Sequence, residues 1–140
     1  MQCQNLEHLT HPSNHFDLVL SSDIMEHVRR PWDAFQEIFR TLKPGGCHIF
    51  TIPVQHPMPS KTIERVDTSG EQDIMLMEPR YHSAPSADKK SSLRSLVYND
   101  FGKDIVDSLQ DIGYEVELLQ PQIEDRDVQR LITFVSKKPK

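Results

Sequence analysis

The chain has 140 residues, which is enough for one domain with one modest hydrophobic core. Apolar residues make up 36% and charged residues 26%, as in ordinary globular proteins, and the net charge of -5 argues against a nucleic-acid-binding protein, which usually carries a basic patch. No apolar run approaches the ~20 residues that span a bilayer, and residues 1–10 do not resemble a signal peptide. Cys3 and Cys47 fit no zinc or redox spacing, so we expect a cytoplasmic protein without a disulfide framework.

Residues 16–54 predict a strand, a helix and a second strand. Phe16 to Ser22 is a short apolar run that ends in small polar residues, which is typical of a buried strand. A helix is predicted from Pro31 to Leu42, since proline suits the first helical position and the apolar residues form one face, namely Trp32, Phe35, Ile38, Phe39 and Leu42. We expect Pro44-Gly45-Gly46 to stop this helix and Cys47 to Val54 to form the second strand, which ends near Pro53. This order is typical of a βαβ unit with a right-handed crossover.

Residues 55–96 interrupt the pattern with a segment rich in proline, serine and charged residues. A structureless loop of this length is uncommon in a compact domain, where it usually forms a lid, a binding loop or a disordered insertion. We interpret the segment as an insertion or lid within one domain. Tyr81 and His82 are its candidates for substrate contact because loops often carry function, and a surface location without a role explains them equally well.

The C-terminal part predicts a second helix and two further strands. Asn99 or Asp100 would cap a helix whose apolar residues recur at helical spacing and which ends at Gly113; these apolar residues are Phe101, Ile105, Leu109 and Ile112. Tyr114 to Leu119 and Leu131 to Val135 would be strands. Four strands and two helices predict an α/β sheet that closes with a hairpin-like pair of strands.

One run of the sequence, from Phe16 to Val54, resembles a known family. It is similar to the region from the fourth strand to the fifth strand of class I S-adenosylmethionine-dependent methyltransferases, of the small-molecule, type 11-like kind. The matching residues are Phe16-Asp17-Leu18-Val19, Glu26-His27-Val28, Glu37-Ile38, Arg40, Leu42-Lys43-Pro44-Gly45-Gly46 and Pro53. The resemblance implies a partial Rossmann-like methyltransferase sheet with strands 4, 5, 6 and 7, of which strand 7 is antiparallel.

The methyl-donor side of this family's site has no clear counterpart in the sequence. Family members bind S-adenosylmethionine with a glycine-rich loop after the first strand, and nothing before Phe16 supplies such a loop. We therefore interpret residues 1–140 as one truncated domain, the C-terminal half only, that binds the cofactor weakly or not at all by itself. The resemblance implies cofactor contacts for Ser22 and Asp23 and for Asn5-Leu6, although Asn5 replaces an acidic residue.

Glu26 and His27 are the predicted catalytic residues. They follow the carboxyl end of the first predicted strand, where ligands bind in open α/β sheets, and an imidazole suits the role of general base. A purely structural role, in which both orient a loop, is the alternative. Asp23, Glu26 and His27 also resemble the metal-binding set of quinone-ring O-methyltransferases, yet members without a metal carry the same residue types, so we predict no metal.

Three hypotheses about function follow. The resemblance implies methyl transfer to an unidentified small-molecule acceptor. A half-domain that no longer catalyses and acts as a structural or interaction module is the alternative, and the missing glycine-rich loop favours it for this chain alone. A nucleotide-dependent oxidoreductase is weaker, because its glycine fingerprint is also missing. In the partial sheet the first strand would be an exposed edge, so we expect a homodimer, with neither nucleic acid nor membrane as partner.

Overall fold

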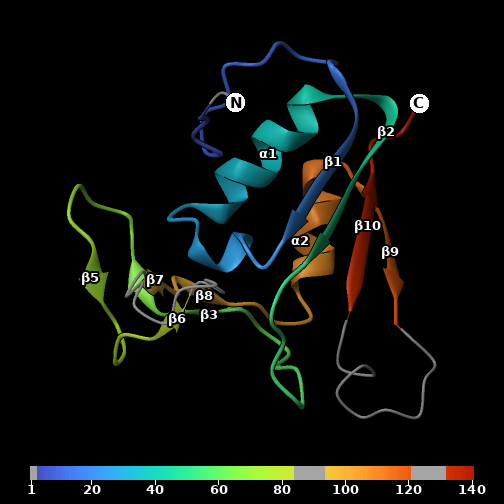
Figure 1. Ribbon diagram of the computed structural model, residues 1–140. Helices are drawn as coiled ribbons and strands as arrows, with labels where there is room; N and C mark the ends of the chain where they lie inside the picture. Colours follow the sequence, from blue (N-terminus) through green and yellow to red (C-terminus); the bar gives the residue numbers. More distant parts are fainter. Residues whose placement is uncertain (1–2, 84–93, 121–131) are drawn as a thin grey trace.

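The computed structural model describes residues 3–83, 94–120 and 132–140, and its centre is a four-stranded sheet (Figure 1). The strand order is β1-β2-β10-β9. Strands β1 (Phe16–Ser22) and β2 (Leu42–Thr51) are parallel, whereas β10 (Thr133–Lys137) runs antiparallel to both β2 and β9 (Glu115–Leu119). This arrangement agrees with the expected α/β sheet that closes with an antiparallel pair of strands.

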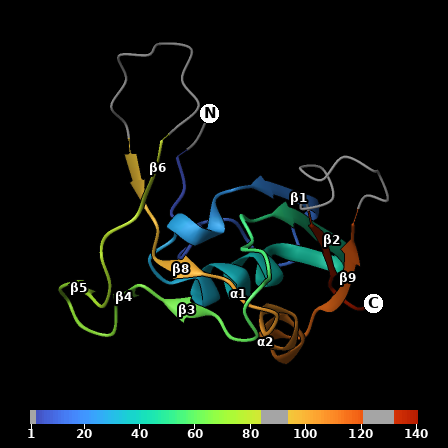
Figure 2. The ribbon, with the colours of Figure 1, turned by 90° about the horizontal axis from the view of Figure 1, so that it is seen from below.

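Two helices pack on the same side of this sheet and share its core (Figures 1 and 2). Helix α1 (Pro31–Thr41) connects β1 to β2, and helix α2 (Ile105–Ile112) precedes β9. Many of the fully buried side chains come from both helices, β2 and β10, among them Phe35, Ile38, Phe50, Ile105, Leu109 and Phe134. The rings of Phe50 and Phe134 stack at 4.8 Å, so the antiparallel strand is tied to the βαβ unit through aromatic packing.

The glycine pair at residues 45 and 46 does not form the predicted turn between helix and strand. Strand β2 begins at Leu42, directly after α1, and its register against β1 shifts between Phe16 and Leu18. Residues 43–46 of β2 lie opposite the single residue Asp17 of β1 and so form a bulge. Within it Gly45 has a φ of 82°, which a residue with a side chain rarely adopts. Strand β2 ends at Thr51, before Pro53, as the missing proline N–H requires.

The segment 55–96 contains secondary structure that the sequence did not predict. Three short antiparallel pairs form: β3 (Ile63–Glu64) with β8 (Asn99–Asp100), β4 (Val66–Asp67) with β5 (Ile74–Met75), and β6 (Tyr81–Ser83) with β7 (Arg94–Leu96). In Figure 1 these pairs lie together at the end of the molecule toward which β1 runs. Residues 84–93 of this segment lie outside the described residues.

Two boundaries in the C-terminal part differ from the prediction. Asn99 and Asp100 do not cap a helix, because both are buried in β8 and α2 begins at Ile105 after Asp104. Helix α2 does end at Gly113, whose φ is 118°. The last strand starts at Thr133 rather than residue 131, which lies outside the described residues. Among the described helices, none is long and apolar enough to cross a membrane.

Candidate active site

The carboxyl end of β1 presents polar groups that are fixed to the neighbouring strand. Ser22 Oγ lies 2.9 Å from Thr51 Oγ1 of β2, and the backbone N–H of Asp23 donates to the carbonyl of Thr51 at 3.0 Å. Asp23 has a φ of 50°, a left-handed conformation that a short polar side chain tolerates better than most. The chain therefore turns sharply here, at the edge of the sheet where α/β proteins bind ligands.

A hollow of about 470 Å³ opens beside this turn. Its lining comes from the ends of β1, β2 and β10 and includes Leu20, Ser22, Ile24, Thr51 and Thr133. It combines apolar walls with a few hydroxyl groups, which is the usual character of a small-molecule site.

Glu26 is the most unusual residue of the site because its carboxylate is buried. It belongs to a short 3₁₀ helix, η1 (Met25–His27), and only 2% of its surface is exposed. Oε1 lies 3.5 Å from Nε2 of His27 and 3.6 Å from Nδ1 of His82. Among the described residues neither carboxylate oxygen has a hydrogen-bond partner, and burial raises the pKa of the Glu26 carboxyl.

His27 is oriented by a backbone carbonyl on the hairpin β6–β7. Its Nδ1 lies 2.8 Å from the carbonyl oxygen of Leu96, and since a carbonyl can only accept, Nδ1 carries a proton. Nε2 is then the ring nitrogen that faces Glu26. The ring of His82 stands edge-on to the His27 ring at 5.0 Å, and burial lowers the pKa of His82.

A buried ion-pair network, which the sequence did not predict, anchors the strands beside this cluster. Asp100 of β8 accepts hydrogen bonds from Arg65 at 3.0 Å and from Arg80, which directly precedes β6. The backbone N–H of Tyr98 donates to the carbonyl of Glu26 at 2.8 Å. These contacts hold the segment 55–96 and β8 against η1. The sequence did not indicate them, because its arginines are scattered through a polar segment.

The structure thus brings together three of the predicted site residues and separates the others. Glu26, His27 and His82 form one cluster, and Tyr81 is half exposed next to His82 on β6. Ser22 ends β1, and Asp23 is separated from η1 only by Ile24. The hydrogen bonds of Asn5 remain local, as its side chain accepts from the backbone of Glu7 at 3.0 Å. Leu6 packs against the hydrophobic core.

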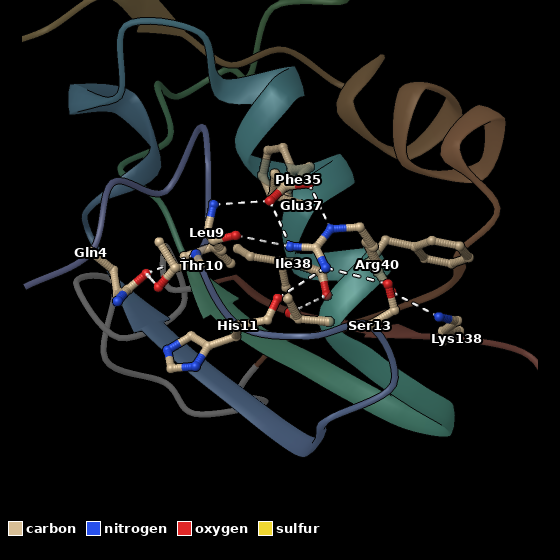
Figure 3. Close-up of polar contacts among 12 residues, drawn as sticks. Gln4, Leu9, Thr10, His11, Ser13, Phe35, Glu37, Ile38, Arg40 and Lys138 are labelled. Atoms are coloured by element: carbon tan, nitrogen blue, oxygen red, sulfur yellow. Dashed lines mark hydrogen bonds and ion pairs between the residues drawn. The ribbon is translucent and has the colours of Figure 1, made fainter. Parts of the chain in front are cut away.

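Glu37 and Arg40, two residues of the sequence resemblance, fasten the N-terminal segment to helix α1 (Figure 3). Arg40 donates to the carbonyls of Leu9 and His11 at 3.0 Å each and to both carboxylate oxygens of Glu37 at 2.8 Å. Glu37 in turn accepts from the backbone of Leu9 at 2.9 Å, and the Arg40 bonds lower the pKa of its carboxyl. Their role is structural, away from the cluster of Glu26.

Comparisons with known proteins agree with this architecture. Residues 1–50 match the profile of a family described as a methyltransferase domain. A 42-residue stretch is 50% identical to ubiquinone/menaquinone biosynthesis C-methyltransferase UbiE of Hydrogenovibrio crunogenus and covers 30% of this chain and 16% of that protein. A 38-residue stretch is 45% identical to an uncharacterized methyltransferase of Mycobacterium bovis, covering 27% of this chain and 15% of the relative.

A solved structure extends the similarity to nearly the whole chain. The S-adenosylmethionine-dependent methyltransferase fold of a Listeria monocytogenes protein superposes with a TM-score of 0.61 at 14% identity, covering 96% of this chain and 67% of that one. The sequence matches span less than a quarter of the curated relatives' length, whereas the match in fold covers 96% of this chain. The chain therefore has the fold of solved S-adenosylmethionine-dependent methyltransferases, and its residues 1–50 match the profile of a methyltransferase domain.

Proposed function

We propose that the chain forms the acceptor side of an S-adenosylmethionine-dependent enzyme that methylates a small molecule. The observation that carries this proposal is the Glu26–His27 pair, placed immediately after the carboxyl end of β1 and covered by the hairpin β6–β7. The hollow beside Ser22 offers room for a small ligand at the same end of the sheet. We also propose a cytoplasmic location, which the two free cysteines support.

The chemistry of the site follows from the orientation of His27. S-adenosylmethionine, when bound, supplies an electrophilic methyl group on its sulfonium sulfur. His27 Nε2 would take the proton that an acceptor hydroxyl or amine loses, and the carboxylate of Glu26, 3.5 Å away, would stabilise the resulting imidazolium. Tyr81 and His82 on β6 would contact the acceptor. Holding the acceptor in line with the methyl group is the larger contribution, because transfer depends on geometry.

The residues of this chain fit only part of the cofactor. Ser22 and Asp23 offer a hydroxyl and a carboxylate at the carboxyl end of β1, where the resemblance expects cofactor contacts, with Asn5 and Leu6 as the further candidates. Residues 1–44 contain no glycine, and the first glycines along the chain, Gly45 and Gly46, lie in the bulge of β2. We therefore propose that this chain alone binds the cofactor weakly.

The alternative is a module that has the fold without the catalysis. The missing glycine-rich turn favours it, and Glu26 and His27 would then only orient the insertion. The two proposals differ in whether the carboxyl end of β1 recognises the cofactor, and that difference is measurable without knowledge of the acceptor.

A titration of the isotope-labelled chain with S-adenosylhomocysteine, the demethylated product, separates the two proposals. We expect amide chemical-shift changes at Ser22 and Asp23 with a dissociation constant of about 1 mM. Ser22→Ala should weaken the response, while Ser69→Ala, a change in an exposed turn of the insertion, should leave it intact. Unchanged spectra at about 5 mM ligand would exclude cofactor recognition by this chain and favour the non-catalytic module.

A further inference from the structure

We propose that Glu26, His27 and His82 form a binding site for one divalent transition-metal ion, for which Zn²⁺ has the best-matched chemistry. Two imidazoles and one carboxylate are ligands that zinc and its neighbours in the first transition row accept, and zinc enzymes use this set with a fourth position left open. The cluster is not the one that the sequence suggested, because His82 from the insertion takes the place considered for Asp23.

The distances within the cluster fit a single ion. The three ligand atoms all lie within 4.8 Å of one another, and Glu26 Oε1 is 3.5 Å from His27 Nε2 and 3.6 Å from His82 Nδ1. Ligands bonded at about 2.0–2.1 Å to a tetrahedral zinc ion lie about 3.4 Å from each other. The two contacts are too long for hydrogen bonds and have the separation of neighbouring ligands around one metal.

His27 already has the second hydrogen bond that metal-binding histidines use. Its Nδ1–H donates to the carbonyl of Leu96 at 2.8 Å, which leaves the lone pair of Nε2 directed at the cluster. Such a bond to a backbone carbonyl fixes the tautomer and the ring orientation of a histidine ligand. The partner strand of the β6 hairpin therefore orients one ligand while β6 itself supplies another.

Glu26 supplies an independent reason for a bound cation. A carboxylate that is 2% exposed, with both oxygens unbonded among the described residues, is costly unless something of positive charge compensates it. The nearby guanidinium of Arg80 is engaged with Asp100, and Arg65 shares the same carboxylate. A divalent ion between Glu26 and the two histidines would compensate the carboxylate directly.

The site is also accessible. The side chain of His27 is 19% exposed and that of His82 is 35% exposed, so an ion can enter from the solvent side and retain an open position there. In the proposed enzyme, which this step takes as its basis, the ion would bind the acceptor oxygen and lower its pKa. With the ion present, His27 Nε2 would be a ligand and could not accept the proton, which the acceptor would instead lose to solvent water.

Cobalt(II) is the probe that reports this geometry without any assay of activity. Titration of the purified full chain with CoCl₂ should give a saturable visible absorption band of a low-symmetry four-coordinate ion, at one equivalent per chain. Zn²⁺ should displace it stoichiometrically. His82→Ala should weaken binding at least about tenfold, and Glu26→Gln should do the same with a fold verified by circular dichroism.

The matched control is the other pair of neighbouring histidines. His11 and His15 stack at 5.8 Å on the N-terminal segment, so H11A/H15A tests for adventitious binding and should leave the cobalt spectrum unchanged. The proposal is overturned by no uptake of either metal, by undiminished uptake in His82→Ala, or by loss of uptake in H11A/H15A. Because S-adenosylhomocysteine recognition at Ser22 is read from amide shifts, failure of the metal site and failure of the proposed function are separately visible.

Discussion

His48 is a histidine that the fold keeps in its neutral form. It lies in β2 with none of its surface exposed, stacked on Phe50 at 4.7 Å, and its Nε2 is 2.9 Å from the hydroxyl of Ser21. Burial lowers the pKa of His48 from 6.5 to about 3. Nothing in the sequence distinguishes this residue from the other six of the seven histidines, since its burial depends on the packing of the helices against that face of the sheet.

Because of this lowered pKa, we expect the folded protein to lose stability as the pH falls. Below pH 6.5 His48 is protonated in the unfolded chain but stays neutral in the folded chain. The contribution of His48 to the free energy of unfolding is therefore complete above pH 6.5 and is lost as the pH falls toward 3. Between pH 7 and pH 5 the loss from this residue is about 2 kcal/mol. Urea unfolding at both pH values should show that His48→Leu loses correspondingly less stability than the wild type. His15→Leu, at an exposed position, should behave as wild type; equal pH dependence in all three proteins would refute the assignment.

At Arg40 we expect stability to depend on the planar geometry of the guanidinium, and not only on its positive charge. Its guanidinium bridges Glu37 and the carbonyls of Leu9 and His11, which a lysine cannot do because its ammonium is a single point. Arg40→Lys should therefore lower the melting temperature by several degrees despite the retained charge, and Arg40→Ala by more. Lys103→Ala, a change at an exposed cation, is the control. A melting temperature of Arg40→Lys equal to that of the wild type, measured by calorimetry, would contradict the bridging role.

Among the helices and strands, those with a clear hydrophobic periodicity could be predicted from the sequence. Apolar spacing indicated the β1-α1-β2 unit and strand β9, and a glycine after the helical pattern indicated the end of α2 at Gly113. The strands of the insertion were missed because each has only two or three residues and is held by contacts with distant segments, such as the pairing of β3 with β8. Local propensity carries no information about such pairs.

The same limit explains the prediction of the site. Glu26 and His27 were identifiable because they follow a predicted strand end. Their relation to His82 depends on how the hairpin β6–β7 folds back over η1, which the Leu96 carbonyl and the Asp100 network determine. Asn99 and Asp100 were mistaken for a helix cap because a cap and a short buried strand both place polar residues before a helix.

Gly102 is where the insertion closes against the start of α2. A Cβ at this position would lie 2.3 Å from the carbonyl carbon of Lys61 and 2.6 Å from the backbone nitrogen of Thr62, closer than atoms can approach. The Gly102 N–H also donates to the hydroxyl of Thr62 at 3.1 Å. Only glycine lets these two backbones meet.

Gly102→Ala should therefore destabilise the protein by about 1–3 kcal/mol, since the backbone of residues 61–62 must shift. Gly70→Ala is the matched control, because the nearest atom to its Cβ would be 3.8 Å away and space is available. Chemical denaturation of both variants tests the packing. A Gly102→Ala protein as stable as Gly70→Ala would show that the insertion closes differently.

On the scale of the whole molecule, the two edges of the sheet differ in their protection. Strand β9 carries Glu115 and Glu117, and charges on an edge discourage further pairing. The only charge on β1 is Asp17, near its start, and it is paired with Lys43 at 2.8 Å. Leu18 and Leu20 of the same strand are 48% and 67% exposed. Among the described residues, β1 is therefore the edge most open to another strand.

We propose that two copies of the chain associate through β1, in an antiparallel pairing about a two-fold axis that would satisfy the free backbone groups and cover both leucines. Light scattering on a size-exclusion column at micromolar concentration should give the mass of two chains. Leu20→Lys should shift the mass to one chain, because it places a charge in the middle of the edge strand. Leu76→Lys alters another exposed leucine, just after β5 and at 54% exposure, and should remain dimeric. A wild-type protein that elutes as a monomer would rule out pairing through β1, and a dimer unaffected by Leu20→Lys would place the contact elsewhere on the molecule.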